Sequence, residues 1–139
     1  MIGLLVVTHG QLANELVKAV TTVVGEIEAL EAVSIGWDDD PSEASRRIDE
    51  AIRRVDRGQG VLLLTDMFGG TPTNLALSLH DAGSIEIVTG VNLPMMIKFS
   101  NLRQDLDLHA AASQVADDGR AAIQVASHLL DVEQSPETR

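Results

Sequence analysis

The chain has 139 residues, which is the size of a single domain. Its 10 Lys and Arg residues against 21 Asp and Glu residues give a formal net charge of −11, and only 2% of its residues are aromatic. The negative charge and the lack of aromatic side chains argue against nucleic acid or an anionic membrane surface as a partner. Cysteine is absent, which excludes disulfides, thiolate metal sites and a cysteine nucleophile.

The first half of the chain alternates short apolar runs with amphipathic segments. Residues 2–7 are predicted to form a buried strand, and residues 11–24 a helix whose apolar side chains recur at helical spacing. Residues 30–35 form the second predicted strand. A helix is predicted to begin at Asp40 and Pro41 and to run to about residue 57, with Asp40 as its N-cap and Glu43 in the position of a capping box.

The second half repeats the alternation. Residues 60–65 are the clearest strand, followed by a short helix over 72–80, a strand over 85–89 and a helix that begins near Pro94. Residues 108–130 keep their apolar side chains roughly in helical phase. Gly119 lies inside this segment, where it indicates either close packing or a break between two helices.

The order of elements predicts an α/β fold. Strands that are apolar throughout indicate a mostly parallel sheet covered by helices on both faces, a three-layer doubly wound arrangement with strand order 2-1-3-4 and a C-terminal helical segment. We expect one domain over residues 1–130 and a flexible tail over 131–139. Ligands of such sheets bind at the carboxyl ends of the strands, where the strand order reverses between strands one and three.

Two polar residues follow the strands at this switch point. His9 lies in Thr8-His9-Gly10 after the first strand, and Asp66 follows the third. The topology should bring the two side chains within hydrogen-bond reach. A carboxylate that holds the Nδ1–H of an imidazole leaves Nε2 as an oriented nucleophile. Alone, each residue is typical of a strand end or a turn; together they predict a catalytic pair in which Asp66 orients His9.

A glycine-rich turn follows Asp66. Gly69 and Gly70 allow backbone N–H groups to approach a ligand closely, while Thr71 and Pro72 suit the start of a helix. A helix N-terminus aimed at the same crevice favours an anion such as a phosphoryl group. The alternative is an ordinary strand-to-helix turn. The patterns of a P-loop and of a dinucleotide fingerprint are absent.

Three further residues follow strands at the same edge of the sheet. Trp37 comes after the second strand, and Asn92 and Pro94 after the fourth. Each is a candidate for the rim of the site or for a partner surface, and each also suits a structural role in packing or a turn. We expect neither a metal ion nor a cofactor.

Three ordered segments carry a family resemblance: residues 6–10 (Val-Val-Thr-His-Gly), residues 64–74 (Leu-Thr-Asp-Met-Phe-Gly-Gly-Thr-Pro-Thr-Asn) and residues 88–95 (Val-Thr-Gly-Val-Asn-Leu-Pro-Met). They resemble the mannose-type enzyme IIA domains of the bacterial phosphoenolpyruvate-dependent sugar phosphotransferase system, over nearly the whole chain. The resemblance implies that His9 is phosphorylated at Nε2 by the phosphocarrier HPr and that Asp66 orients its Nδ1. It also implies that Thr71 and the neighbouring amides of Phe68, Gly69 and Gly70 hold the phosphoryl oxygens.

The resemblance further implies a homodimer that passes phosphate to a IIB subunit of a mannose-type permease or to a regulatory target. With no basic leader before the first strand and no apolar run long enough to span a bilayer, we expect a cytoplasmic protein.

Two alternatives remain at this stage. A receiver-like signalling domain would be phosphorylated on Asp66, and a non-catalytic interaction module would sense phosphate without transferring it. Phosphohistidine is labile in acid and survives alkali, whereas aspartyl phosphate is hydrolysed by alkali, so the stability of the label separates the first alternative from the histidine carrier.

Overall fold

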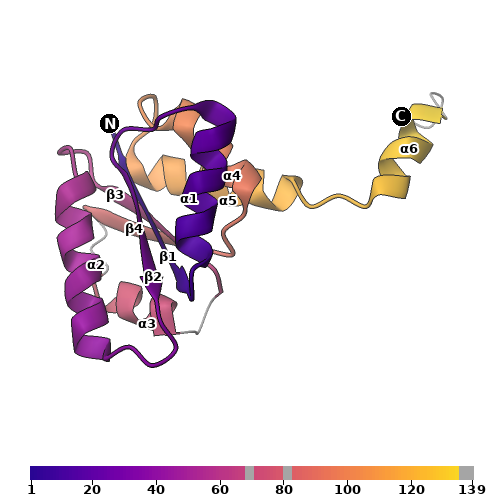
Figure 1. Cartoon of the computed structure of the whole chain (residues 1–139). Coiled ribbons are helices and arrows are strands. Elements are labelled where there is room, and N and C mark those ends of the chain that lie inside the picture. Colours follow the sequence, from indigo (N-terminus) through magenta and orange to yellow (C-terminus); the bar gives the residue numbers. More distant parts are fainter. Residues whose placement is uncertain (68–70, 80–82, 135–139) are drawn as a thin grey trace.

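The sheet of the protein is four-stranded and entirely parallel in the computed structural model, which describes residues 1–67, 71–79 and 83–134. The strands are β1 (Gly3–His9), β2 (Leu30–Ile35), β3 (Val61–Thr65) and β4 (Ile85–Thr89). Their order is β2-β1-β3-β4, which confirms the predicted order (Figure 1). The direction of winding reverses between β1 and β3, so the carboxyl ends of these two strands flank the switch point.

Helices cover both faces of the sheet and make three layers. They are α1 (Leu12–Val24), α2 (Pro41–Val55), α3 (Thr71–Ser78), α4 (Leu93–Leu102), α5 (Leu108–Ala121) and α6 (Ala126–Gln134). Apolar residues of α1, α4 and α5 pack on one face with Leu4 and Val6 of β1, whereas α2 and α3 pack on the other with Leu5 and Val7. Successive residues of β1 thus enter opposite cores, which explains why its sequence is apolar without interruption.

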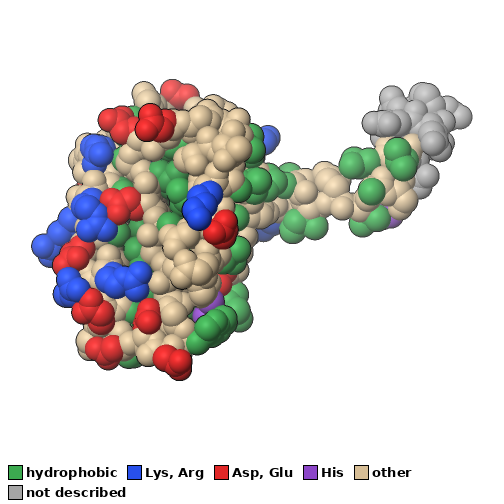
Figure 2. All heavy atoms as spheres, in the orientation of Figure 1, with side chains coloured by type: hydrophobic (Ala, Val, Ile, Leu, Met, Phe, Trp, Pro, Cys, Tyr) green, Lys and Arg blue, Asp and Glu red, His purple; other side chains and the backbone are tan. Residues whose placement is uncertain are grey.

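Helix α2 starts where the sequence predicts, but not through the predicted capping box. Asp40 is the N-cap and Pro41 opens the helix, yet the Asp40 side chain makes no capping hydrogen bond. The capping box is therefore wrong: Glu43 instead forms an ion pair with Arg46, one turn along the exposed face. Over α2, basic and acidic side chains are interleaved, as Figure 2 shows.

Arg103 closes the end of the sheet opposite to His9. It is buried and follows α4 directly. Its guanidinium donates hydrogen bonds to the backbone carbonyl of Ile2 at 2.6 and 2.9 Å, and to those of Glu28 and Ala29 at 2.5 and 3.0 Å. These carbonyls lie just before β1 and β2, so one side chain ties the starts of both strands to α4.

The C-terminal segment is two helices rather than one. Gly119 lies inside α5 and packs closely against Met95, whose terminal methyl group a Cβ at this position would overlap. The break comes later, between Ala121 and Ala126. Helix α6 projects from the body of the molecule (Figure 1), exposes Leu129 and Leu130, and continues helical structure into the segment predicted as a tail. Residues 135–139 lie outside the described residues.

Among the described residues, we find no helix with the length and apolar character that crossing a membrane requires.

Candidate functional site

The expected proximity of His9 and Asp66 is observed. His9 is the last residue of β1, and Asp66 follows β3 directly. His9 Nδ1 lies 2.8 Å from Asp66 Oδ2, and the backbone N–H of His9 donates a hydrogen bond of 3.1 Å to the same oxygen. Because β1 and β3 are paired in register up to Val7 and Thr65, the adjacent strand ends deliver both groups to one point.

The Asp66 carboxylate is held in its ionised form. Burial raises the pKa of the Asp66 carboxyl, but the hydrogen bonds from the side chain and backbone of His9, together with the electrostatic interaction with His9, outweigh burial and hold this pKa below its ordinary value of 3.8. The second carboxylate oxygen accepts a hydrogen bond of 3.0 Å from the backbone N–H of Met67. An ionised carboxylate therefore faces Nδ1 at neutral pH.

This arrangement determines which nitrogen of His9 is available. An ionised carboxylate accepts hydrogen bonds only, so it selects the tautomer with the proton on Nδ1 and the lone pair on Nε2. Both side chains are largely covered, with exposed fractions of 19% for His9 and 16% for Asp66. The pair is thus an oriented imidazole nucleophile next to a fixed negative charge.

Trp37, predicted as a rim residue, lies against the imidazole of His9. The ring centroids are 5.1 Å apart and the ring planes are inclined by 25°, which is a stacked arrangement. Trp37 is nevertheless 79% exposed, because only one face of its indole meets His9. Among the described residues, Trp37 is the one rim candidate whose ring stacks on His9.

Thr8 has a role that sequence reasoning missed. Its buried hydroxyl accepts a hydrogen bond of 2.6 Å from the backbone N–H of Ala13, in the first turn of α1. Gln11, the residue at the N-cap position, makes no side-chain cap. The hydroxyl of Thr8 satisfies this helix donor from the strand, and so fixes the turn around His9. A threonine next to a strand-end histidine was the available signal, but its partner in the next helix was not visible in the sequence.

The predicted phosphate-binding segment is described only in part. Phe68, Gly69 and Gly70 lie outside the described residues. Thr71 is exposed and is the first residue of α3, which packs against β1 and α2. The helix that was predicted after the glycine-rich turn is therefore present and begins at Thr71, after β3.

Asn92 and Pro94 have structural roles. The Asn92 side chain accepts a hydrogen bond of 3.0 Å from the backbone N–H of Met95 and donates one of 3.1 Å to the carbonyl of Gly119, so it caps α4 and ties it to α5. Pro94 lies in the first turn of α4. Asn92 also lines a cavity of about 200 Å³ beside β4, whose described lining includes neither His9 nor Asp66.

His109 is not part of the pair formed by His9 and Asp66. It is 85% exposed at the start of α5, with Nδ1 3.8 Å from a carboxylate oxygen of Glu86. Within residues 1–67, 71–79 and 83–134, no three His, Asp or Glu side chains gather in a way that could hold a metal ion.

Comparison with known proteins gives consistent matches. The family model EIIA-man, described as "PTS system fructose IIA component", matches residues 3–116. The mannose-specific EIIAB component of the phosphotransferase system (PTS) of Escherichia coli is 33% identical over 110 residues, covering 75% of this chain and 32% of that protein, so the chain spans about a third of this relative. The fructose-specific EIIA component of Bacillus subtilis is 27% identical, covering 94% of this chain and 90% of that protein.

A solved structure has a similar fold. A crystal structure of the phosphotransferase system component EIIA from Streptococcus agalactiae superimposes with a TM-score of 0.83 at 20% identity, covering 92% of this chain and 99% of that one.

Proposed function

The chain belongs to the EIIA-man family of phosphotransferase system components, and from this premise we propose that it is a phosphohistidine carrier whose acceptor atom is Nε2 of His9. The observation that carries the proposal is the 2.8 Å contact between His9 Nδ1 and Asp66 Oδ2. It supports the role of His9 that the family resemblance implies, because it orients one nitrogen and leaves the other available for reaction.

The proposed step is an in-line displacement at phosphorus. Nε2 of His9 attacks the phosphoryl group carried by HPr, a bond from Nε2 to phosphorus forms, and the bond from phosphorus to the donor atom breaks with its electron pair on the donor. The proton on Nδ1 stays in its hydrogen bond to Asp66. As the imidazole gains positive charge, the adjacent carboxylate stabilises it. The reverse sequence delivers the group to a IIB-type protein or to a regulatory target.

The phosphoryl oxygens need donors in the same crevice. We assign this role to Thr71 and to the backbone amides of Phe68, Gly69 and Gly70, as the family resemblance implies. The support is the position of Thr71 at the start of α3, directly after the segment that follows Asp66. Backbone donors suit this chain, because phosphoryl transfer requires mainly positioning and electrostatic stabilisation. A chain with a net charge of −11 can still bind an anion where local dipoles are favourable.

The domain, the oligomeric state, the location and the partners complete the proposal. Residues 1–130 would form the carrier domain, working as a homodimer in the cytoplasm between HPr and a IIB subunit of a mannose-type permease or a regulatory partner. Their support is membership of the family, which implies the phosphotransferase system.

The test is phosphoryl transfer from phosphoenolpyruvate through enzyme I and HPr to the full chain. We expect the wild type and the control His109→Ala to be labelled at equal rates, Asp66→Ala to be labelled slowly and His9→Ala not to be labelled. The label should be lost in acid and retained in alkali. Undiminished labelling of His9→Ala would reject the assignment, and a label that is lost in alkali and depends on Asp66 would favour the receiver-like alternative.

A further inference from the structure

The loop after β2 holds an aromatic ring over the proposed phosphoryl acceptor. The backbone N–H of Asp39 donates a hydrogen bond of 3.2 Å to the carbonyl of Gly36, so residues 36–39 form a tight turn with Trp37 and Asp38 at its centre. His9 is the register partner of Ile35, the last residue of β2, and the N–H of Gly10 donates a hydrogen bond of 2.8 Å to the Ile35 carbonyl. The turn is therefore anchored beside His9 by the sheet itself.

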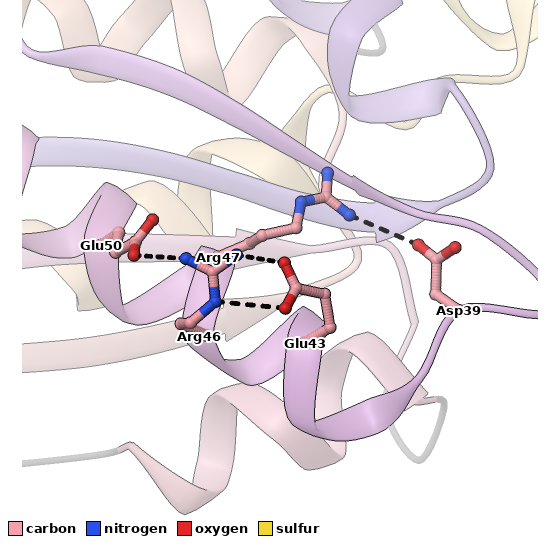
Figure 3. A network of polar contacts seen from close by, with 5 residues as sticks. All are labelled: Asp39, Glu43, Arg46, Arg47 and Glu50. Atoms are coloured by element: carbon pink, nitrogen blue, oxygen red, sulfur yellow. Dashed lines mark hydrogen bonds and ion pairs between the residues drawn. The ribbon is translucent and has the colours of Figure 1, made fainter.

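The turn is also fixed from its outer side. Oδ2 of Asp39 accepts a hydrogen bond of 2.7 Å from the backbone N–H of Gly36, and Arg47 reaches from α2 to the same oxygen at 3.3 Å (Figure 3). The second terminal nitrogen of Arg47 donates to the backbone carbonyl of Ser34 at 3.1 Å. Arg47 thus links α2 to both the end of β2 and the turn, and the position of Trp37 does not depend on its own side-chain packing alone.

The stack leaves the reactive direction open. The indole lies against a face of the imidazole, with centroids 5.1 Å apart and planes 25° from parallel. The lone pair of Nε2 points outward in the plane of the imidazole ring, so a ring stacked on the face does not obstruct approach along that plane. A Cβ on Gly10 would lie 3.8 Å from the indole nitrogen, which shows that the indole extends along the glycine that follows His9.

One hydrogen bond does not orient an imidazole completely. The contact from Nδ1 to Asp66 holds one corner of the ring, but the ring can still tilt about that contact. A flat surface on its face removes the tilt. An indole is also the side chain whose face attracts a cation most strongly, so it favours the imidazole as positive charge develops during attack on phosphorus.

We infer that Trp37 is a positioning residue for phosphoryl transfer: stacked on His9, it fixes the plane of the imidazole that Asp66 holds at Nδ1, and it stabilises the ring as positive charge develops. The inference rests on the proposed function, because it assigns Trp37 a part in the same transfer step. In this role Trp37 acts through the imidazole of His9 and not directly on phosphorus or the donor.

Two substitutions separate stacking from bulk. Trp37→Phe keeps an aromatic face, whereas Trp37→Leu keeps an apolar side chain without one; Leu12→Ala, at an exposed apolar position at the start of α1, is the matched control. Transfer from phosphorylated HPr is followed in single turnovers at increasing donor concentration. We expect Trp37→Leu to lower the rate at saturating donor about fivefold, as the loss of one cation–π contact predicts. Trp37→Phe should recover most of that loss, and Leu12→Ala should leave the saturating rate unchanged.

Either of two kinetic results would overturn the inference. If Trp37→Leu only raised the donor concentration needed for half-maximal rate, Trp37 would be a docking contact rather than a positioning residue. If Trp37→Phe were as slow as Trp37→Leu, the aromatic face would have no part in the step.

Fluorescence tests the stack without relying on rates. Trp37 is the only tryptophan in the chain, so its emission reports on its own surroundings. We expect the emission of the wild type to change on phosphorylation, and the emission of His9→Ala to differ from the wild type and to ignore the donor. Identical spectra for the two proteins, in a wild type that is phosphorylated, would reject the stack alone. A wild type that HPr does not label would instead reject the proposed function, and with it any role of Trp37 in transfer.

Discussion

Replacing Asp66 by asparagine removes the charge of the proposed orienting group while keeping its shape. Oδ2 of Asp66 accepts hydrogen bonds from both Nδ1 and the backbone N–H of His9, and Oδ1 accepts one from the backbone N–H of Met67. In Asp66→Asn the amide oxygen takes the position with two donors, and the NH₂ group faces Met67. The bond to His9 is therefore kept, but as a hydrogen bond to a neutral acceptor.

The expected cost follows from this exchange. A hydrogen bond to a charged group contributes about 1.5–3 kcal/mol and a neutral one about 0.5–1.5 kcal/mol, so the substitution removes about 1–2 kcal/mol of stabilisation from the cationic imidazole. Since 1.36 kcal/mol corresponds to a factor of ten in rate, phosphoryl transfer to His9 should slow about 5- to 30-fold. Asp66→Ala should slow it further, because it also leaves the backbone donors without their carboxylate.

Single-turnover transfer from phosphorylated HPr at saturating donor measures this rate directly, with His109→Ala as a control that lies outside the pair. The reasoning would be refuted if Asp66→Asn transferred at the wild-type rate, since the charge would then have no part in the step. Complete loss of labelling in Asp66→Asn would also refute it, because a group that only orients the imidazole slows the reaction and does not abolish it.

Three further predictions concern stability. Arg103→Met should lower the free energy of unfolding in urea by about 3 kcal/mol, because buried carbonyls at the start of the sheet lose their donor. The substitution should leave phosphoryl transfer to His9, at the opposite end of the sheet, unchanged. A loss of unfolding free energy below about 1 kcal/mol would contradict this prediction. Gly3→Ala puts a methyl group against the backbone carbonyl of Val55, so α2 must shift at a cost of about 1–3 kcal/mol, and an unchanged Tm would show that the contact is not tight. The lowered pKa of Asp66 means that its stabilising contribution is fully present above the ordinary carboxyl value of 3.8 and is lost as the pH falls through the lower folded-state value. The difference in unfolding free energy between wild type and Asp66→Asn should therefore shrink in acid, and a difference of the same size at all pH values would count against the ionised pair.

The strand order and the meeting of His9 with Asp66 were accessible from the sequence. Uninterrupted apolar strands that alternate with amphipathic helices restrict the topology to few arrangements, and the 2-1-3-4 order by itself makes the ends of β1 and β3 neighbours. Residues that directly follow those strands are then brought together whatever the details of packing.

Contacts between elements distant in the sequence were not accessible in this way. The hydroxyl of Thr8 caps α1 from a strand, and Asn92 bridges to the carbonyl of Gly119, although both residues suit ordinary turns. Glu43 had the spacing of a capping box, but an arginine one turn away competes for its carboxylate. Spacing identifies which groups are near along the chain, whereas the choice between partners depends on the tertiary fold.

The stack of Trp37 on His9 belongs to the same class. The sequence placed both residues at one edge of the sheet, but the ring contact follows from a turn whose shape depends on Asp39 and on Arg47 of α2.

The central claim is that Nε2 of His9 carries the phosphoryl group, and the most direct test is to identify the modified atom. The chain is prepared with isotope-labelled histidine, phosphorylated through phosphoenolpyruvate, enzyme I and HPr, and studied by nitrogen and phosphorus NMR without denaturation. We predict one phosphorylated imidazole, absent from His9→Ala, with phosphorus bonded to Nε2 and the proton retained on Nδ1. Phosphorus bonded to Nδ1, or to any residue other than His9, would contradict the account.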